Sequence, residues 1–355
     1  MAEAQAARLR DRTGRGKARY LQRSSSERSP ANFADFELAK GNRSAAKKKV
    51  LKRSKLMKLS ATAAGRRWRK RCYATMAPVL PPLHTLFKTF SAAGDHSFTA
   101  SITEEWMQGR TTYGGLSAGI CFEAASRFIN DDRVPLRSAQ VTFVGPAGGG
   151  AEIDVTLVRA SKAMSFVRAE LSTGGKVATS ALFAFGAARS SSFDELHIHP
   201  APADILSPNQ CPDFYVAGMK MRPVFLQNFE ARLARGGRPV TASSDCDNWL
   251  WVRHLGACDA GHVDGPMTST TCLLALADMP PPAIMPKFTE VAPVASVSWH
   301  VNLLTDTPRS APGGWWLLRS RAESARQGYS SQDMTLFGGD GQSALVGRQS
   351  VAIYA

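Results

Sequence analysis

The folded region begins near Leu83. In its first half, hydrophobic residues recur with two different periods, one typical of strands and one typical of helices. Phe98–Ile102 alternates with a period of two, which predicts a strand. Between Tyr113 and Ile129, apolar side chains recur every three or four residues, which predicts a helix. Glycine-rich turns separate the four strands predicted after this helix: Arg137–Val144, Glu152–Arg159, Ser165–Leu171 and Lys176–Gly186.

The second half repeats this order of elements. Its helix is predicted at Gly265–Asp278, where Pro266 suits the first turn and small or apolar residues on every side indicate a helix buried all round. Met279 and the three prolines after it end the helix. Strands are predicted before it at Val224–Leu233 and Trp249–His254, and after it at Val294–Leu303, Trp315–Ser324, Ser330–Phe337 and Ala344–Tyr354.

The short connections between these strands decide the fold class. Hairpin-length turns favour antiparallel neighbours and argue against a parallel sheet with crossover helices. A long buried helix wrapped by a curved antiparallel sheet is an α+β arrangement called a hotdog, and the repeated order predicts a double hotdog. We therefore expect a first repeat at residues 83–187, a linker rich in serine and proline at 188–215, and a second repeat at 216–355.

The positive charge of the chain is confined to its N-terminal part. The net charge is +15 over 355 residues, but Met1–Thr75 holds 22 of the 44 Lys and Arg and only 5 of the 29 Asp and Glu. The remainder, with 22 basic and 24 acidic residues, is nearly neutral. The extension lacks a sustained apolar period, so its composition predicts no fold of its own.

This basic extension has three interpretations. It can be a nucleic-acid-binding tail, because dense Lys and Arg neutralise phosphates without a fold. It can be an organelle transit peptide, although its acidic residues argue against that. It can also result from a start codon assigned too early, with translation beginning at Met76. The last interpretation is favoured, because the folded pattern starts just after Met76.

The remaining composition limits the cell compartment and the cofactors. The six cysteines show no paired CxxC spacing, which is typical of reduced thiols in a cytoplasmic protein. No apolar run reaches transmembrane length, and no signal-peptide core follows the first charges. His197 and His199 have a ligand-like spacing but lie in the predicted linker without a Cys or carboxylate cluster, so neither a metal nor another cofactor is expected.

Asp278 is the residue most out of place in this pattern. It ends a helix that should lie in the core, and a carboxylate there faces the negative end of the helix dipole. A catalytic role is one reason to keep such a group. The strand that follows offers hydroxyl side chains at alternate positions, among them Ser296. The sequence therefore predicts a site where this helix meets that strand.

Three stretches of the sequence resemble the acyl-CoA thioesterase II-like family of double-hotdog enzymes. Gly109–Gly115 resembles the segment that opens the family's helix, while Glu323–Gly328 and Ala344–Gln349 resemble its last two strands. The similarity covers Phe98 to Ala355 and leaves the basic extension out. The order of the motifs is more specific than any one of them.

This resemblance implies an activity and a set of residues. The family hydrolyses fatty acyl-CoA, without a metal or a covalent intermediate, by means of a water held by an Asp, a hydroxyl residue and a Gln. By their positions in the motifs, these residues match Asp278, Ser296 and Gln349. The family more usually has Thr where Ser296 stands, so this chain departs from the pattern at one of the three positions.

The chemistry of these residue types agrees with that role. An aspartate can orient or deprotonate a water, and a hydroxyl and an amide can each donate and accept hydrogen bonds to fix it. The first repeat appears apolar at the point that corresponds to Gln349, which we place at Leu182, so only the second repeat is expected to carry the water site. The oxyanion donor is expected at the N–H of Gly115, at a helix N-terminus, with Gly114 allowing close approach.

Each of the three residues also has a purely structural interpretation. Asp278 would cap the turn before the prolines, Ser296 would bond to the backbone of its strand, and Gln349 would be solvated. Gly115–Gly119 matches the G-x-S-x-G nucleophile elbow, but the elbow needs a buried strand immediately before it. Ser117 is therefore interpreted as a small residue that packs within a helix.

The histidines and tryptophans near the predicted site are interpreted as structural. His262 precedes the second helix and His300 lies on the strand that carries Ser296, where an ordinary polar contact is the simpler explanation. For the tryptophans on or beside predicted strands, both a place in the core and lining of an acyl pocket are open, and the core is favoured: Trp249, Trp251, Trp299, Trp315 and Trp316.

The sequence thus predicts an acyl-CoA thioesterase of fatty acid metabolism, with acyl-CoA as its partner and no membrane span. A catalytically weak acyl-CoA-binding module is the main alternative, kept open by Ser296. Nucleic-acid binding through Met1–Thr75 is a third, and assembly into a homo-oligomer stays open. A hydratase is less favoured because the first helix has no His at its opening.

We expect a chain that begins at Met76 to be soluble, and to melt and turn over like the full chain. The reason is that the charge excess ends at Thr75 and the alternating pattern begins later. Thermal melts and activity assays of both chains check this, and aggregation or loss of most activity after truncation contradicts it. A salt-dependent shift of DNA that disappears with the extension would instead support the nucleic-acid interpretation.

Overall fold

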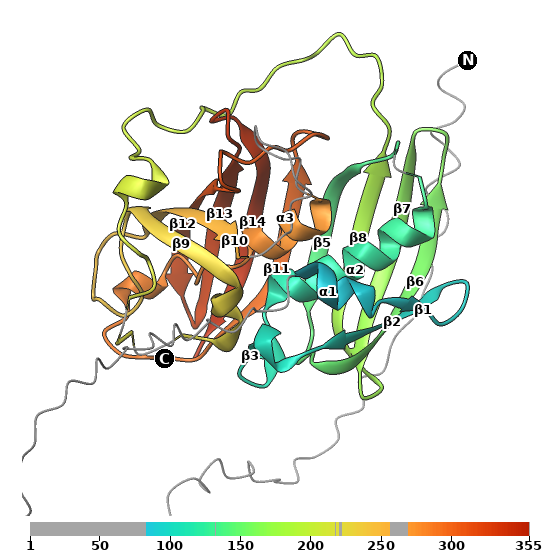
Figure 1. Ribbon diagram of the computed structural model, residues 1–355, viewed down its shortest axis with the longest axis horizontal. Helices are drawn as coiled ribbons and strands as arrows, with labels where there is room; N and C mark the ends of the chain where they lie inside the picture. Colours follow the sequence, from blue (N-terminus) through green and yellow to red (C-terminus); the bar gives the residue numbers. More distant parts are fainter. Residues whose placement is uncertain (1–82, 132, 217, 220–221, 256–268, 355) are drawn as a thin grey trace, which may run out of the picture. The chain divides into compact units, whose positions relative to one another are not determined.

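The alternating segments pair edge to edge into a twelve-stranded antiparallel sheet in the computed structural model (Figure 1). The structure describes residues 83–131, 133–216, 218–219, 222–255 and 269–354. The basic extension, His262 and Pro266 therefore lie outside the described residues.

Each half of the described chain contributes six strands to this sheet. The first half forms β1 (Ser91–Ala92), β2 (Ser97–Ile102), β5 (Leu136–Phe143), β6 (Gly149–Ala160), β7 (Met164–Thr173) and β8 (Lys176–Gly186). The second half forms β9 (Phe229–Arg235), β10 (Asp247–His254), β11 (Val294–Leu303), β12 (Trp316–Arg326), β13 (Tyr329–Phe337) and β14 (Ser343–Ile353). A small separate hairpin consists of β3 (Met107–Gln108) and β4 (Thr111–Thr112).

The two halves use the same strand order. Apart from the edge strands β1 and β9, the orders are β2-β6-β7-β8-β5 and β10-β12-β13-β14-β11. In each half, the strand before the helix is therefore farthest out and the first strand after the helix is at the centre. The two central strands, β5 and β11, pair antiparallel with Gln140 opposite His300, so the sheet continues across both halves.

Helices cover one side of the sheet. They are α1 (Leu83–Lys88), α2 (Gly114–Ile129) and α3 (Thr270–Ala277), and Figure 1 shows α2 and α3 on the same side. The side chains of α2 that face inward, such as Leu116 and Ile120, are fully buried, and α3 is buried from Thr271 onward. Four short 3-10 turns complete the described elements: η1 (Glu104–Trp106), η2 (Pro208–Gln210), η3 (Val224–Asn228) and η4 (Met285–Lys287).

The helices α2 and α3 pack closely and antiparallel. A Cβ atom placed on Gly115 would lie 2.8 Å from the Ala275 carbonyl oxygen, and one on Gly119 would lie 3.3 Å from that of Thr271. Positions that advance along α2 thus meet positions that go back along α3. A hydrogen bond of 2.8 Å from the Thr271 hydroxyl to Glu123 ties the helices further along. The first residues of α2 therefore meet the last residues of α3.

The predicted start of the second helix is wrong. Ser269 has extended backbone angles, φ −60° and ψ 145°, and its side chain accepts a hydrogen bond from the backbone N–H of Cys272. This cap satisfies a free N–H of the first turn, so α3 begins at Thr270 and not near Gly265. The predicted end is correct within one residue, because Asp278 occupies the C-cap.

The strand predicted at Val224–Leu233 is only partly correct. Its first half forms η3, and the strand β9 starts at Phe229. Phe225 and Leu226 are buried, and the Phe225 ring stacks on Tyr113 with 4.1 Å between ring centroids. Packing against the residue that precedes α2 has therefore overridden the strand pattern of these apolar residues.

Among the helices in the described part of the chain, none combines the length and the apolar character needed to cross a membrane.

We expect Gly115→Ala to lower the melting temperature by about 4–8 °C, because overpacking against the Ala275 carbonyl costs about 2 kcal/mol in a chain of this size. Gly119→Ala is the matched control. Its new methyl group meets a looser contact, and the higher helix propensity of Ala, up to about 1 kcal/mol, offsets that contact. Thermal melts of both variants check the prediction, and an equal effect of the two changes would contradict it.

Candidate active site

Asp278 ends α3 at the edge of the buried core. Its φ of −101° and ψ of 10° leave the helix, and its backbone N–H donates to the Leu276 carbonyl in a tightened last turn. Pro280–Pro282 follow and prevent another helical turn. The side chain is half-buried and lines a cavity.

Gln349 joins Asp278 to Ser296. Its amide nitrogen Nε2 donates to Oδ1 of Asp278 at 2.7 Å and to Oγ of Ser296 at 3.1 Å. The structure thus brings together the three residues that the sequence singled out, from α3, β11 and β14. Since both hydrogens of the amide are used on these two partners, the Ser296 hydroxyl accepts from Gln349 and keeps its own hydrogen for another acceptor.

An irregularity in β11 lets Ser296 reach Gln349. The buried residues Trp299, Val301 and Leu303 alternate along the strand, and this alternation would turn Val297 inward rather than Ser296. The pairing with β14 shifts register between Ser296 and Ser298, so one extra residue is accommodated there. Such a bulge changes which side chain faces inward, and here it aims the serine at the site.

The N-terminus of α2 contacts Asp278 from the other side. A Cβ atom on Gly114 would lie 2.7 Å from Oδ2 of Asp278, and one on Gly115 would lie 2.9 Å from its Cβ. The backbone N–H of Gly115 donates to the Asp278 carboxylate. The carboxylate thus lies between the negative end of one helix dipole and the positive end of another.

Burial dominates the acidity of Asp278. Loss of solvent raises the pKa of its carboxyl group from the ordinary 3.8 to about 7, and hydrogen bonds from Gln349 and from the Gly115 N–H offset part of that rise. A general base works best with a pKa near the operating pH. At neutral pH, Asp278 is therefore divided between its two protonation states and can take up a proton.

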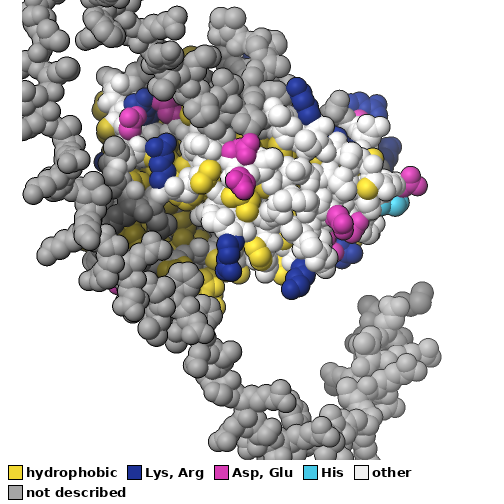
Figure 2. All heavy atoms as spheres, turned by 60° about the horizontal axis from the view of Figure 1, so that its bottom comes forward, with side chains coloured by type: hydrophobic (Ala, Val, Ile, Leu, Met, Phe, Trp, Pro, Cys, Tyr) yellow, Lys and Arg dark blue, Asp and Glu magenta, His cyan; other side chains and the backbone are white. Residues whose placement is uncertain are grey.

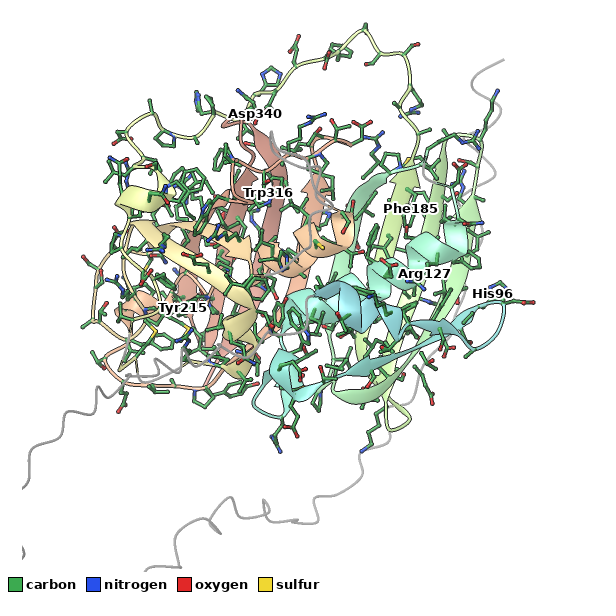
Figure 3. All side chains as sticks on the ribbon, in the orientation of Figure 1. His96, Arg127, Phe185, Tyr215, Trp316 and Asp340 are labelled. Carbon is green, nitrogen blue, oxygen red and sulfur yellow. The ribbon has the colours of Figure 1, made fainter. Side chains whose placement is uncertain are left out.

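A cavity of about 770 Å³ opens beside this group. Figure 2 shows hydrophobic side chains on the face of the molecule that lies at the bottom of Figure 1. Asp278 and Arg110 are the charged side chains among the described residues of its lining. The apolar part of the lining consists mainly of Phe143, Tyr215, Phe225, Leu226, Met279, Met285 and Val294. Figure 3 labels Tyr215 on this side.

Gly114 and Gly115 differ in their access to the cavity. Gly114 is among the lining residues, whereas Gly115 is buried behind it. Both lie at the start of α2, where N–H groups without helical partners point outward. Whether either N–H receives the oxyanion stays a prediction, but the close contacts already explain why side chains are excluded from both positions.

Ser117 lies inside α2, and its hydroxyl donates to the Gly114 carbonyl at 2.9 Å within the same helix. The strand before α2 is the two-residue β4 of the small hairpin, not a buried strand of the main sheet. The nucleophile-elbow motif therefore lacks the strand context that the elbow requires.

The described histidines lie away from this site. His300 is exposed and is 3.1 Å from the Ser138 hydroxyl across β5 and β11, while His197 pairs with Glu195 after β8. In the described ranges, no group of three or more potential ligands could hold a metal ion. Among the described cysteines, Cys121, Cys211 and Cys246 are free thiols. The five tryptophans named above are absent from the described cavity lining.

Leu182, which the sequence set against Gln349, does not lie on the inner face of the sheet. Leu182 is half-buried and alternates with the buried Ala181 and Phe183 of β8, so it faces the other side of the sheet. Ala181 and Phe183 face inward, and Phe183 packs edge-on against Phe122 of α2 with 5.7 Å between ring centroids. An apolar residue still occupies the inner face there, so the contrast with Gln349 remains.

Gln332 is a polar residue of the site region that the sequence pattern did not reveal. It lies on β13 directly opposite Gln349 and is 2% exposed. Its Nε2 donates to Oε1 of Gln349 at 2.8 Å. The only signal in the sequence is a glutamine at every-second-residue spacing from Met334 and Leu336, and that spacing alone does not say which face is buried.

We expect Asp278→Asn to stabilise the fold more at pH 8 than at pH 5. Because the folded pKa of about 7 lies above the ordinary 3.8, the folded carboxyl keeps its proton where the unfolded one loses it. Stability is therefore lost as pH rises from about 4 through 7, and asparagine avoids this loss. The free energy of unfolding should favour the variant by an additional 1–3 kcal/mol, roughly, at the higher pH.

Thermal or urea melts of both proteins at the two pH values measure this difference. An advantage of the variant that does not change with pH would show that the fold leaves the Asp278 pKa near its ordinary value. A variant that is less stable at both pH values would support the role of Asp278 as a cap.

Comparison with known proteins gives evidence that is independent of the site geometry. The model of the acyl-CoA thioesterase N-terminal domain matches residues 102–186, and that of the acyl-CoA thioesterase C-terminal domain matches residues 208–353. Among the curated proteins, none matches the sequence. The two matched ranges contain α2 and α3, respectively, and most strands of the sheet.

Several solved structures share the fold. A conserved protein of unknown function with a hot dog fold from Alicyclobacillus acidocaldarius is 22% identical, covering 75% of this chain and 96% of its own, with a TM-score of 0.63. The tesB protein of Mycobacterium avium subs paratuberculosis is 15% identical, covering 77% and 100%, with a TM-score of 0.60. An acyl-CoA thioesterase II from Mycobacterium marinum is 17% identical, covering 75% and 96%, with a TM-score of 0.56.

At these identities the structural similarity establishes only a hotdog fold. The family models are matched to the sequence, so they are the evidence for the family. They match the two halves in the order that the strand topology repeats. The resemblance expected from the motifs is confirmed. The chain belongs to the acyl-CoA thioesterase family and is a thioester hydrolase.

Proposed function

We propose that this chain hydrolyses acyl-CoA to a free acid and CoA, using a water held by Asp278, Ser296 and Gln349. The observation that carries the proposal is the amide of Gln349, which bonds the acid and the hydroxyl at the wall of one cavity. We also propose that the scaffold is a double hotdog, with repeats at residues 83–187 and 216–355 joined by the linker 188–215. The repeated strand order supports this division.

The water is the nucleophile in this reaction. Asp278 takes one of its protons while the water oxygen attacks the thioester carbonyl carbon, and the tetrahedral intermediate then collapses with loss of the CoA thiolate. The free hydrogen of Ser296 donates to the water or to the carbonyl group. A pKa of about 7 lets Asp278 hold that proton and then return it to the leaving sulfur.

The N-terminus of α2 is our candidate for the oxyanion site. In the resting site, the Gly115 N–H supports the Asp278 carboxylate. As Asp278 takes up a proton, its negative charge disappears while the substrate oxygen gains one. The same N–H and the helix dipole can then stabilise the oxygen, with Gly114 leaving room for it. Binding that strengthens only in the transition state accelerates the chemical step.

The charges and the apolar wall of the cavity give the substrate an orientation. Its apolar side chains suit an acyl chain, which gains from leaving water. Arg110, on the exposed turn between β3 and β4, is the cation in the described lining, and we assign it to the phosphates of CoA. The thioester would then lie between these two regions, beside Asp278.

The test is a free-thiol release assay over a panel of acyl-CoA chain lengths. We expect Asp278→Asn to lower kcat by on the order of 10²–10⁴-fold with little change in KM, because the change removes the base but not the binding surface. The kcat of the unchanged protein should rise with pH through about 7, since the deprotonated carboxylate is the active form. Asp278→Asn should lose this rise.

Two control variants separate the roles. Arg110→Ala should raise KM for acyl-CoA more than it lowers kcat, and the effect should shrink at high salt. Ser117→Ala should keep turnover within a few-fold. Near-normal turnover of Asp278→Asn would overturn the assignment of the base, and binding without turnover in the unchanged protein would show an acyl-CoA-binding module instead.

A further inference from the structure

We propose that Gln332 is a positioning residue that fixes which end of the Gln349 amide faces the site. A chain of hydrogen bonds leads from the backbone to the candidate water site. The Ala283 N–H donates to Oε1 of Gln332 at 2.8 Å, and Nε2 of Gln332 donates to Oε1 of Gln349 at 2.8 Å. Nε2 of Gln349 then donates to Asp278 and Ser296. This inference rests on the function proposed above.

The direction of this chain is set at its start. A backbone N–H can only donate, so the oxygen of the Gln332 side chain must face Ala283 and its NH₂ group must face away. That NH₂ group in turn selects the oxygen of Gln349. A glutamine without such a neighbour can turn its amide over at little cost, because its two ends have nearly the same shape.

The fixed direction matters because the two ends of the Gln349 amide act oppositely on the site. With NH₂ forward, Gln349 stabilises the Asp278 carboxylate and leaves the Ser296 hydrogen free. With oxygen forward, it would repel the carboxylate, favour the protonated acid and draw the serine hydrogen to itself. Only the first arrangement leaves both a base and a donor for the water.

Gln332 does this without reaching the substrate. It is 2% exposed, is not among the described residues that line the cavity, and lies behind Gln349 on the neighbouring strand. Ala283, its backbone partner, is fully buried and follows the prolines after α3. The chain of hydrogen bonds therefore starts at Ala283, on the segment that follows Asp278. The same segment thus positions both the acid and the amide of Gln349 that supports it.

The test compares pH–rate profiles of Gln332→Met, which keeps the approximate size of the side chain and removes its hydrogen bonds, with those of the unchanged protein. We expect kcat to fall about 10–100-fold, KM to change less than about threefold, and the midpoint of the rise in kcat to move up by about one pH unit. The other described titratable side chains of the lining are Arg110, Tyr113, Tyr215 and Tyr354. Asp278 is the carboxylate among the described residues of the lining, so we assign the midpoint to it.

Two further variants exclude a merely structural effect. Ser330→Ala is the matched control, because Ser330 is two residues away on the same face of β13 and equally buried. It should leave the midpoint unchanged. In a Gln349→Met background, Gln332→Met should cause no further loss of kcat, because Gln332 acts through Gln349. If Gln332→Met does not fold, Gln332→Leu takes its place, since it also offers Gln349 no hydrogen and adds no titrating group, and it should shift the midpoint in the same direction.

An unchanged midpoint in a folded Gln332 variant, or losses from the Gln332 and Gln349 changes that multiply, would overturn the positioning role. The function proposed above fails separately. It fails if Asp278→Asn keeps its turnover, whereas a collapse of Asp278→Asn together with a normal Gln332→Met removes the positioning role alone.

Discussion

The close antiparallel contact between α2 and α3 is the constraint on which the site depends. It is possible only because glycines occupy the first turns of α2, where a Cβ atom would meet the backbone of α3. The contact brings free N–H groups and the positive end of one helix dipole to the carboxylate at the end of the other helix. Together with the hydrogen bond from Gln349, the Gly115 N–H offsets part of the rise in the Asp278 pKa that burial causes. The packing of α2 on α3 therefore also affects the acidity of Asp278.

The sheet supplies the second requirement of the site, which is a pair of glutamine side chains whose amide groups both donate in the direction of Asp278. Most buried side chains of the sheet are apolar, and a buried polar group costs free energy unless it has a partner. Gln332 and Gln349 meet this condition as a pair across β13 and β14. Their bonds end at a backbone N–H on one side and at Asp278 and Ser296 on the other. The two buried glutamines therefore belong to one directed line of hydrogen bonds.

Sequence reasoning succeeded where a local rule governs the structure. The alternation of side chains predicted β8 and β11 with the bounds that are observed, and the misfit of an acid at the end of an apolar helix led to Asp278. It failed where distant contacts decide. Phe225 and Leu226 read as strand residues but turn to pack on Tyr113, and the register shift that aims Ser296 is a property of the pairing with β14. Gln332 stayed hidden because its importance lies in what faces it across a strand.

The difference between Phe183 and Gln349 on the inner faces of β8 and β14 has a consequence for how the sequences of the two halves can evolve. In a pair of identical chains, any polar residue introduced at one copy of a position would appear at the other and disturb two cores. Here both halves belong to one chain, so one half can keep an aromatic cluster of Phe122, Phe183 and Phe185 while the other carries the polar pair Gln332 and Gln349. A substitution in one half therefore leaves the core of the other half unchanged.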